Sequence, residues 1–512
     1  MLRTEDNNKR IAKNTLFLYF RMLLTMIISL FTSRVILKAL GAEDYGIYNV
    51  VGGVITMLNF ITNSLSGAGS RFITFELGKG NIEKLKNTFS AIMFINIGLA
   101  LLILILGETI GLWFVQNKLV IPEDRVVASL WVYQCSIITA IIGILSAPYN
   151  SLIISHEKMS AFAYISIIEV VLKLVIVYLL MLSPCDKLIL YSILLLFVQL
   201  LIRFIYTKYS SRHFEESRVR PLWNVELFKE IGLYSLWTMN GNLAIVGYTQ
   251  GINILLNMFF GPLVNAARGI AVQVQTAALT FVQNFLTAIN PQIIKSYAVE
   301  DYNYMHNLVV AASKYGFFLM LVITFPLIVL VNPILKLWLG SVPEYTTTFV
   351  VIMLYASLLS PLSRTLVTAI NATGNIKKFQ IFEGTSLLMV VPMAYVLLIF
   401  FNISPEAVMW IYIGVEIFTQ LIRMVIVLPA IQMRMGFYIK SVLLPILVPF
   451  LFFALVIYMI CIPIELTFLQ IIGYASILCL SILVVIIIFG LNKDERLMFK
   501  SQTLNFVNKL KR

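Results

Sequence analysis

The sequence predicts an all-α integral membrane protein with about fourteen transmembrane helices. Hydrophobic residues make up 60% of the chain and charged residues 12%, against roughly 45–50% and about 25% in soluble domains. Charge-free runs at 91–106, 442–460 and 471–488 approach the roughly 20 residues that a helix needs to cross the hydrocarbon. A soluble fold has no means of covering so much apolar surface, so lipid is the expected solvent.

The hydrophobic runs, taken in chain order, give the individual spans. The first follows a basic segment and lacks a small-residue cleavage site, so we expect a retained helix rather than a removed signal peptide. We predict spans at 14–37, 46–68, 88–107, 126–147, 161–181, 188–207, 231–257, 262–290, 308–331, 346–370, 380–401, 405–428, 441–460 and 467–490.

The distribution of lysine and arginine predicts the orientation, because positively charged loops stay in the cytoplasm. With the N-terminus inside, the inner segments hold 25 of the 38 Lys and Arg residues and the outer loops hold five. Both termini are therefore expected to be cytoplasmic. The net charge of +13 is explained by this topology and by attraction to anionic membrane lipids, and no nucleic-acid partner is expected.

The longest predicted inner loop divides the chain into two lobes. We expect an N-lobe at 1–207, an inter-lobe loop at 208–230, a C-lobe at 231–428, two further helices at 441–490 and a basic cytoplasmic tail at 491–512. A shift of 220 residues supports two pseudo-symmetric six-helix lobes, since it pairs Gly41 with Gly261, Val54 with Val274, Thr56 with Thr276, Ala68 with Ala288 and Asn87 with Asn307. A substrate cavity is expected between such repeats.

Three predicted spans carry a polar stripe at helical spacing. The stripes contain the amides Asn59 and Asn63 in span 46–68, Asn242 and Asn253 in span 231–257, and Gln273 and Gln283 in span 262–290. Amides donate and accept hydrogen bonds, as a cavity that receives a sugar requires. The alternative is that they join neighbouring helices by interhelical hydrogen bonds.

Several arginines lie inside predicted spans, where charges are costly and mark functional sites. Arg21, Arg34, Arg268 and Arg364 occur in helices without an acidic residue. Guanidinium groups bind phosphate oxygens through paired, charge-assisted hydrogen bonds, so these residues predict an anion or pyrophosphate site. Arg34 and Arg268 lie near span ends and have snorkelling as an alternative. Arg71, just past span 46–68, is either a topology charge or a gate or headgroup contact.

Acidic residues inside the spans have cations nearby. Glu169 and Lys173 are four residues apart on one predicted helix, the spacing at which opposite charges meet. They predict either an internal ion pair or an ion-coupling site. Glu383, Glu416 and Arg423 are interpreted as structural residues.

The chain resembles the bacterial oligosaccharide and O-antigen flippases (Wzx-like) of the multidrug/oligosaccharidyl-lipid/polysaccharide (MOP) exporter superfamily. The resemblance rests on span number, lobe pattern and local sequence. Its most specific stretches are residues 14–20 with Arg21, Thr32 to Arg34, LGAEDYGIYNVVGG at 40–53, Arg71-Phe72, FFGPLVNAARGIA at 259–271 and PQIIKSYA at 291–298.

The resemblance implies a V-shaped bundle in the bacterial inner membrane. Such a protein alternates access and moves undecaprenyl-pyrophosphate-linked sugar repeats to the outer leaflet, with the cavity arginines holding the pyrophosphate. Its implied partners are the lipid-linked oligosaccharide, membrane lipids, and the glycosyltransferases and polysaccharide polymerase of the same system. Cation-exporting relatives tend to keep an acidic residue in the first helix, whereas this chain has Arg21 and Arg34 there.

Two other functions are weighed against a flippase. One is a MATE-like cation or drug antiporter of the same fold. The other is a membrane-embedded polysaccharide polymerase, an enzyme whose chemistry needs a positioned acid or base. The three histidines fall in predicted inner segments, so an outward-facing catalytic site is not expected. No P-loop motif and no cysteine spacing of metal ligands occur, and no cofactor or metal is expected.

Overall fold

The computed structural model describes residues 14–26, 59–118, 121–218, 224–260, 262–339, 342–459, 466–493 and 495–497, with isolated positions at 28, 32, 35, 36, 39, 40, 44, 47, 48, 51 and 463. All regular structure in these residues is helical. The chain divides into two compact units, Met1–Leu243 with Ile294–Glu300, and Ala244–Ile293 with Asp301–Arg512. Each unit is described by itself.

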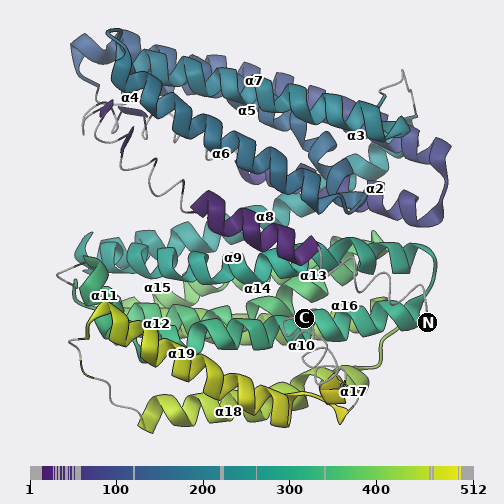
Figure 1. Ribbon diagram of the computed structural model, residues 1–512, viewed down its shortest axis with the longest axis vertical. Coiled ribbons are helices and arrows are strands. Elements are labelled where there is room, and N and C mark those ends of the chain that lie inside the picture. The colour runs from purple at the N-terminus through teal and green to yellow at the C-terminus, as the bar shows by residue number, and fades with distance from the viewer. Residues whose placement is uncertain are drawn as a thin grey trace, which may run out of the picture. The chain divides into compact units, whose positions relative to one another are not determined.

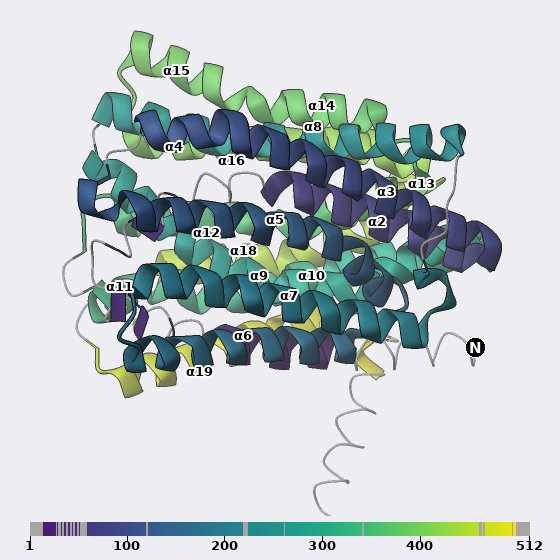
Figure 2. The same ribbon diagram turned by 90° about the horizontal axis from the view of Figure 1, so that it is seen from above.

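The first unit is a bundle arranged around α5 (Figures 1 and 2). It contains the helical residues 14–26, followed by α2 (Asn59–Lys79), α3 (Ile82–Leu106), a π-helix (Gly107–Gly111), α4 (Leu112–Lys118), a 3-10 turn (Glu123–Arg125), α5 (Val126–Ser155), α6 (Met159–Leu182), α7 (Lys187–His213) and a 3-10 turn (Glu215–Ser217). Helix α5 packs against α7, α2 and α3, and α6 packs against α7.

A buried tyrosine connects the π-helix to the core of the first unit. Tyr133 is fully buried together with Val132, Ile137 and Leu188. Its hydroxyl donates to the carbonyl of Gly107 at 2.7 Å. The same carbonyl accepts from the backbone N–H of Leu112, the i→i+5 bond of a π turn, so Tyr133 is its second donor.

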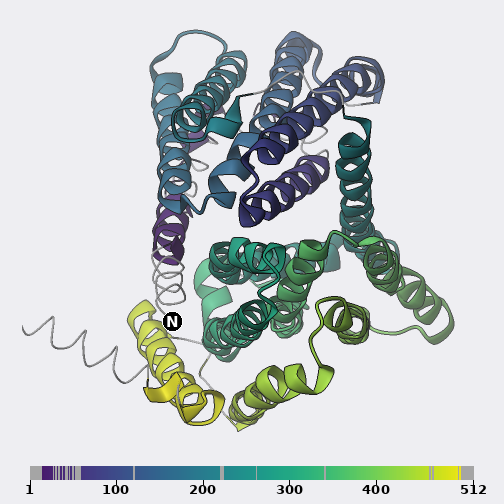
Figure 3. The same ribbon diagram turned by 90° about the vertical axis from the view of Figure 1, so that its right-hand side faces the viewer.

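Two long helices run through both units, α8 (Val225–Phe260) and α9 (Pro262–Ala298). The rest of the second unit contains α10 (Tyr302–Val329), α11 (Val331–Leu339), α12 (Thr346–Ser357), α13 (Ser360–Thr373), α14 (Lys377–Leu388), α15 (Val390–Phe401), α16 (Pro405–Ala430), α17 (Met435–Tyr438), a π-helix (Ile439–Leu443), α18 (Leu444–Met459), α19 (Phe468–Val485) and a π-helix (Ile486–Gly490). Helix α10 packs against α13, α18 and α19, and α16 packs against α12, α13 and α14. Figure 3 views most helices of this unit nearly end-on.

The predicted class, an all-α multi-pass membrane protein, is confirmed. Eleven helices in the described residues are long and apolar enough to cross a membrane. Predicted spans 14–37 and 46–68 are described only in part, with gaps after residues 26 and 51. Helix α9, which contains predicted span 262–290, has 37 residues but carries a polar stripe and is not among the eleven. The total of fourteen therefore stays a prediction.

Two predicted spans, 346–370 and 380–401, are found as single candidate spans, Thr346–Thr373 and Lys377–Phe401. Within each, a short turn separates two helices, α12 from α13 and α14 from α15. Both breaks precede a proline, Pro361 at the start of α13 and Pro392 near the start of α15. Proline has no amide hydrogen to continue the preceding helix. The predicted outer loop at 108–125 is instead helical as far as Lys118.

The last turn of α9 belongs to the first unit and lies against α2. A Cβ atom added to Gly78 of α2 would lie 2.8 Å from the Cβ of Ala298 and 3.1 Å from backbone atoms of Lys295. The Lys295 ammonium forms an ion pair at 2.6 Å with Glu157, whose side chain is fully buried. Glycine at position 78 therefore permits a helix contact that a larger residue would separate.

We expect Gly78→Ala to destabilise the protein. The added methyl group meets backbone-fixed atoms, and overpacking of this kind costs about 1–3 kcal/mol. Thermal unfolding of the purified protein in detergent measures the effect. The matched control is Gly67→Ala in the same helix, where no atom lies within 4 Å of the added Cβ and alanine favours the helix by about 1 kcal/mol. Equal melting temperatures for the two variants would contradict the close contact.

Candidate functional site

Arg268 of α9 is a buried cation in the second unit. Only 3% of the surface of Arg268 is exposed. Its Nη1 donates to the Oδ1 of Asn253 on α8, and the Asn253 amide donates to Gln250 at 3.0 Å. Within the described residues the Nε of Arg268 is buried and makes no hydrogen bond. The guanidinium group therefore has a donor available for a further acceptor.

A second arginine of this unit, Arg364, shares two electrostatic partners with Arg268, the tyrosines Tyr248 and Tyr412. Arg364 of α13 is exposed, and its Nε donates to the hydroxyl of Ser360 at 3.2 Å. The rings of Tyr248 of α8 and Tyr412 of α16 are stacked, with centroids 5.6 Å apart and an angle of 21° between their planes. Both arginines interact electrostatically with both tyrosines. Arg268 and Arg364 thus converge on one tyrosine pair.

This arrangement has the charge required for binding an anion. In the part of the chain that the structure describes, no carboxylate lies within ion-pair distance of Arg268 or Arg364. Two guanidinium groups without a paired carboxylate attract an anion strongly where water is scarce. We define Arg268, Arg364, Tyr248 and Tyr412 as the arginine–tyrosine site.

Another buried arginine of this unit is fully paired. Arg423 of α16, 4% exposed, donates from Nε to Glu383 of α14 at 2.7 Å and from Nη1 to Glu416 at 2.7 Å. Ser363 of α13 donates to Glu416 at 3.2 Å and accepts from Arg423 at 2.8 Å. These contacts join the helices α13, α14 and α16. Such helix-joining contacts are what the structural interpretation of these residues from the sequence expects.

In the first unit, Arg21 and the pair Glu169–Lys173 lie near the same tyrosine. The Arg21 guanidinium is 4.5 Å from the ring centroid of Phe162 and interacts electrostatically with Tyr206. Glu169 also interacts with Tyr206, and it accepts from Lys173 at 2.6 Å. The ion pair forms as its spacing allows, while a role in ion coupling stays a prediction.

Arg71 of α2 is enclosed by aromatic rings. It is 5% exposed and lies 4.5, 4.9 and 5.5 Å from the ring centroids of Phe72, Phe75 and Tyr234. Glu76 and Glu230 interact with it electrostatically. These contacts fit a structural cation better than an open anion site.

The predicted cavity amides have varied surroundings. Asn242 donates to the hydroxyl of Ser64 at 2.6 Å within the first unit, a helix-joining contact. Gln273 is exposed and Gln283 is half-buried. Arg34 and the side chains of Asn59 and Asn63 lie outside the described residues. Among the predicted amides whose side chains the structure describes, Asn253 is the one bonded to a predicted arginine.

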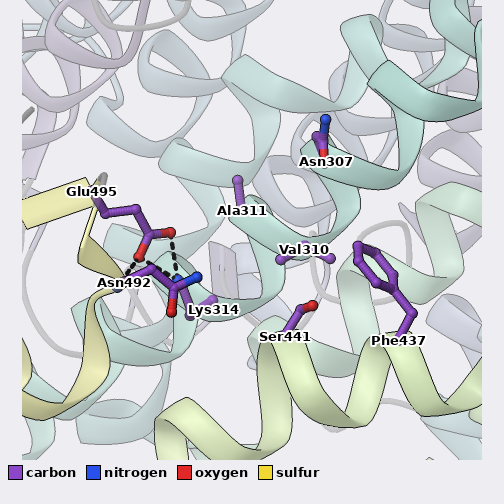
Figure 4. A pocket seen from close by; sticks show the side chains of 8 residues that line it. All are labelled: Asn307, Val310, Ala311, Lys314, Phe437, Ser441, Asn492 and Glu495. Atoms are coloured by element: carbon purple, nitrogen blue, oxygen red, sulfur yellow. Dashed lines mark hydrogen bonds and ion pairs between the residues drawn. The ribbon is translucent and has the colours of Figure 1, made fainter.

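A cavity of about 320 Å³ with polar and apolar lining residues lies beside the first half of α10 (Figure 4). Its lining includes Lys314, which is 1% exposed, and Glu495, which follows the π-helix after α19. The Lys314 ammonium donates to Glu495 at 2.5 and 2.7 Å, and the Tyr315 hydroxyl donates to the same carboxylate at 2.8 Å. Sequence analysis missed this pair because 181 residues separate its members, although a lone lysine in span 308–331 was a usable signal.

The protonation of Glu495 is governed by these contacts. Burial by itself disfavours the ionised carboxylate, but hydrogen bonds from Lys314, the backbone of Asn492 and Tyr315 outweigh it and hold the pKa of Glu495 below its usual value. The contacts of Glu495 thus anchor the segment after α19 to α10. Arg496 holds this segment to the preceding π-helix as well, because its guanidinium donates to the carbonyls of Leu491 and Ile488.

The chain is similar to one protein family and to several solved transporter structures. The family described as "Polysaccharide biosynthesis protein" matches residues 11–299. An outward-facing MATE transporter of the MOP superfamily is similar with a TM-score of 0.72 at 14% identity, covering 84% of this chain and 96% of the other. A MOP-superfamily transporter from Pyrococcus furiosus is similar with a TM-score of 0.72 at 14% sequence identity, over 83% of this chain and 96% of the other. A mutant MATE transporter from Vibrio cholerae is similar with a TM-score of 0.70 at 17% sequence identity, over 84% of this chain and 98% of the other. No curated protein matches significantly.

We expect Arg423→Met to destabilise the second unit strongly. It leaves Glu383 and Glu416 buried without their cation, and breaking a buried ion pair from one side costs about 3–5 kcal/mol. Adding Glu383→Gln and Glu416→Gln removes the unpaired charges and should restore most of the loss. Unfolding in mixed micelles compares the single and triple variants. A triple variant no more stable than the single one would show that packing, not charge, dominates.

The anchoring of residues 491–497 should depend on pH. Because the pKa of Glu495 is depressed in the folded protein, its contribution is present above the usual value, about 4.3, and is lost as the pH falls through the lowered value. The segment should stay anchored at pH 5 and loosen only in stronger acid. A dye on Leu497→Cys, in a cysteine-free background, reports this as fluorescence anisotropy. Glu495→Gln should lower the anisotropy at pH 5 and above to the level that the wild type reaches only in stronger acid, and a variant with wild-type anisotropy at pH 5 would contradict the anchor.

Proposed function

Because the chain belongs to the family of polysaccharide biosynthesis proteins and has the fold of MOP-superfamily transporters, we propose that it is a lipid-linked oligosaccharide flippase. It moves sugar repeats attached to undecaprenyl pyrophosphate from the inner to the outer leaflet by alternating access. Its place is the bacterial cell membrane, with both termini in the cytoplasm. Glycosyltransferases supply the cargo on the inner side and a polysaccharide polymerase consumes it outside.

The observation that carries the proposal is the arginine–tyrosine site. A pyrophosphate diester is doubly anionic and offers acceptor oxygens spaced for guanidinium forks. The free Nε of Arg268 and the exposed guanidinium of Arg364 provide donors for it. Because burial has already removed water from Arg268, an arriving phosphate recovers charge-assisted hydrogen bonds that this arginine lacks.

Neighbouring groups suit the sugar that follows the phosphate. Asn253 and Gln250 present amides beside Arg268, and Gln273 lies exposed further along α9. Hydroxyl-rich cargo needs paired donors and acceptors of this kind. The amides therefore select for a glycan adjoining the pyrophosphate, while the arginines bind the charge.

A cation or drug antiporter is the second candidate, and the likeness to MATE transporters favours it. A cationic cargo requires an acidic or aromatic site, so the net positive arginine–tyrosine site opposes this reading. Resistance to cationic dyes on expression, without a change in surface glycan, would establish the antiporter instead.

We expect the double variant Arg268→Gln and Arg364→Gln to abolish export. Each charged hydrogen bond lost costs about 1.5–3 kcal/mol, which weakens cargo binding on the order of ten- to a hundredfold per arginine. Cells whose own copy of the gene is replaced by the variant should lose surface polysaccharide and accumulate the lipid-linked repeat in the inner leaflet.

The matched control is Arg203→Gln. Arg203 is another intramembrane arginine, half-buried in α7 beside Tyr149 and Ser146, outside the arginine–tyrosine site. Membrane amounts of each variant are measured to exclude loss of protein. Normal export by the double variant, at wild-type protein levels, would overturn the assignment of the pyrophosphate site.

A further inference from the structure

The cavity beside α10 lies where three candidate membrane spans end (Figure 4). It is lined from the first half of α10, from α17 and the π-helix before α18, and from the segment after α19. The spans that contain or precede these elements begin at Tyr302 and Met435 and end at Gly490. The ends of membrane spans lie at the level of the lipid headgroups, which on the predicted orientation are those of the inner leaflet.

Three polar side chains of the lining are available to a ligand. Those of Asn307, Ser441 and Asn492 are exposed or half-buried, and they form no hydrogen bond with any other residue that the structure describes. Ser441 differs in this from Ser476 and Ser481 of α19, which each donate to a carbonyl of their own helix at 2.8 Å. Ser441 lies in a π turn, and such turns are frequent at functional sites.

The charge around the cavity favours an anionic ligand. Glu495 already accepts hydrogen bonds from Lys314, Tyr315 and a backbone N–H, so its carboxylate offers little to a cation. Residues 493–496 contain two basic and two acidic residues. Lys314 in the lining and Lys440 next to Ser441 therefore leave the lining residues and their sequence neighbours with a surplus of positive charge.

The remaining part of the lining is apolar. Val310, Ala311 and Phe437 belong to it, and the ring of Phe437 is exposed. Ile439 and Leu444, which follow Phe437 toward α18, are exposed as well. A soluble phosphate gains nothing from such a surface, whereas the glycerol carbons and the first acyl carbons of a phospholipid are stabilised against it.

We propose that this cavity binds the phosphodiester headgroup of an anionic glycerophospholipid of the inner leaflet. The amide and hydroxyl donors bond the phosphate oxygens, and the surplus positive charge attracts the anionic headgroup. The volume of about 320 Å³ lies within the range of about 300–1,000 Å³ that is usual for small-ligand sites. No residue of the arginine–tyrosine site lies on the elements that line the cavity, so this lipid is separate from the transported cargo.

Native mass spectrometry tests the site on the full-length chain, freed of lipid in detergent and titrated with phosphatidylglycerol. The double variant Asn307→Ala and Ser441→Ala loses two donors to the phosphate. The dissociation constant of the first bound lipid should rise about tenfold for each donor. If the double variant does not fold, each single variant should show its own tenfold loss. Wild-type affinity in the variants would overturn the site.

The matched control is the double variant Asn375→Ala and Ser476→Ala. It changes the same residue types at exposed positions outside the cavity and should keep the wild-type affinity. An equal loss in the control would show a general surface effect and overturn the site.

Two further ligands identify the occupant. Phosphatidylcholine has the same phosphodiester but no net charge, so the wild type should bind it more weakly than phosphatidylglycerol. Equal affinity for the two lipids would overturn the preference for an anionic headgroup. Glycerol 3-phosphate carries a phosphate without acyl chains and should not displace phosphatidylglycerol at equal concentration. Displacement would assign the cavity to a soluble phosphate and overturn the lipid as its ligand.

Discussion

Inside lipid an ionised side chain is stable only beside an opposite charge or water, and this constraint sorts the charged residues of the described helices. Glu169 is matched by Lys173, Lys314 by Glu495, and Arg423 by two carboxylates. Arg268 and Arg364 have amide and hydroxyl contacts instead. Among the described residues, the second unit therefore contains two arginines without an ion-pair partner, and we propose that a substrate anion neutralises them.

Much of the fold was predictable because hydrophobic length and charge placement are local properties. Runs without charge indicate helices regardless of what packs against them, and eleven described helices meet that description. The breaks before Pro361 and Pro392 were missed because a helix can continue through proline, as α5 does at Pro148. Whether proline divides a helix depends on neighbouring helices, which the local sequence does not contain.

The candidate site was predictable in its residue types but not in its pairings. Arg268 and Asn253 were both predicted from their occurrence inside spans, and 15 residues separate them. The tyrosines that connect Arg268 to Arg364 were not predicted, since tyrosine is common in membrane helices and Tyr248 and Tyr412 are distant in sequence. Likewise, the sharing of the Arg423 guanidinium between Glu383 and Glu416 emerges only when α13, α14 and α16 are brought together.

The pairing of Lys314 with Glu495 has a consequence for biosynthesis. Helix α10 leaves the ribosome 181 residues before its counter-ion, which at about 5–20 residues per second is a delay of roughly 10–35 s. During that interval its buried ammonium has to remain at the water interface or borrow a temporary partner. Insertion of the second unit is therefore completed from the carboxyl-terminal end, and a nascent chain released early would leave an unmatched cation for quality-control proteases to recognise.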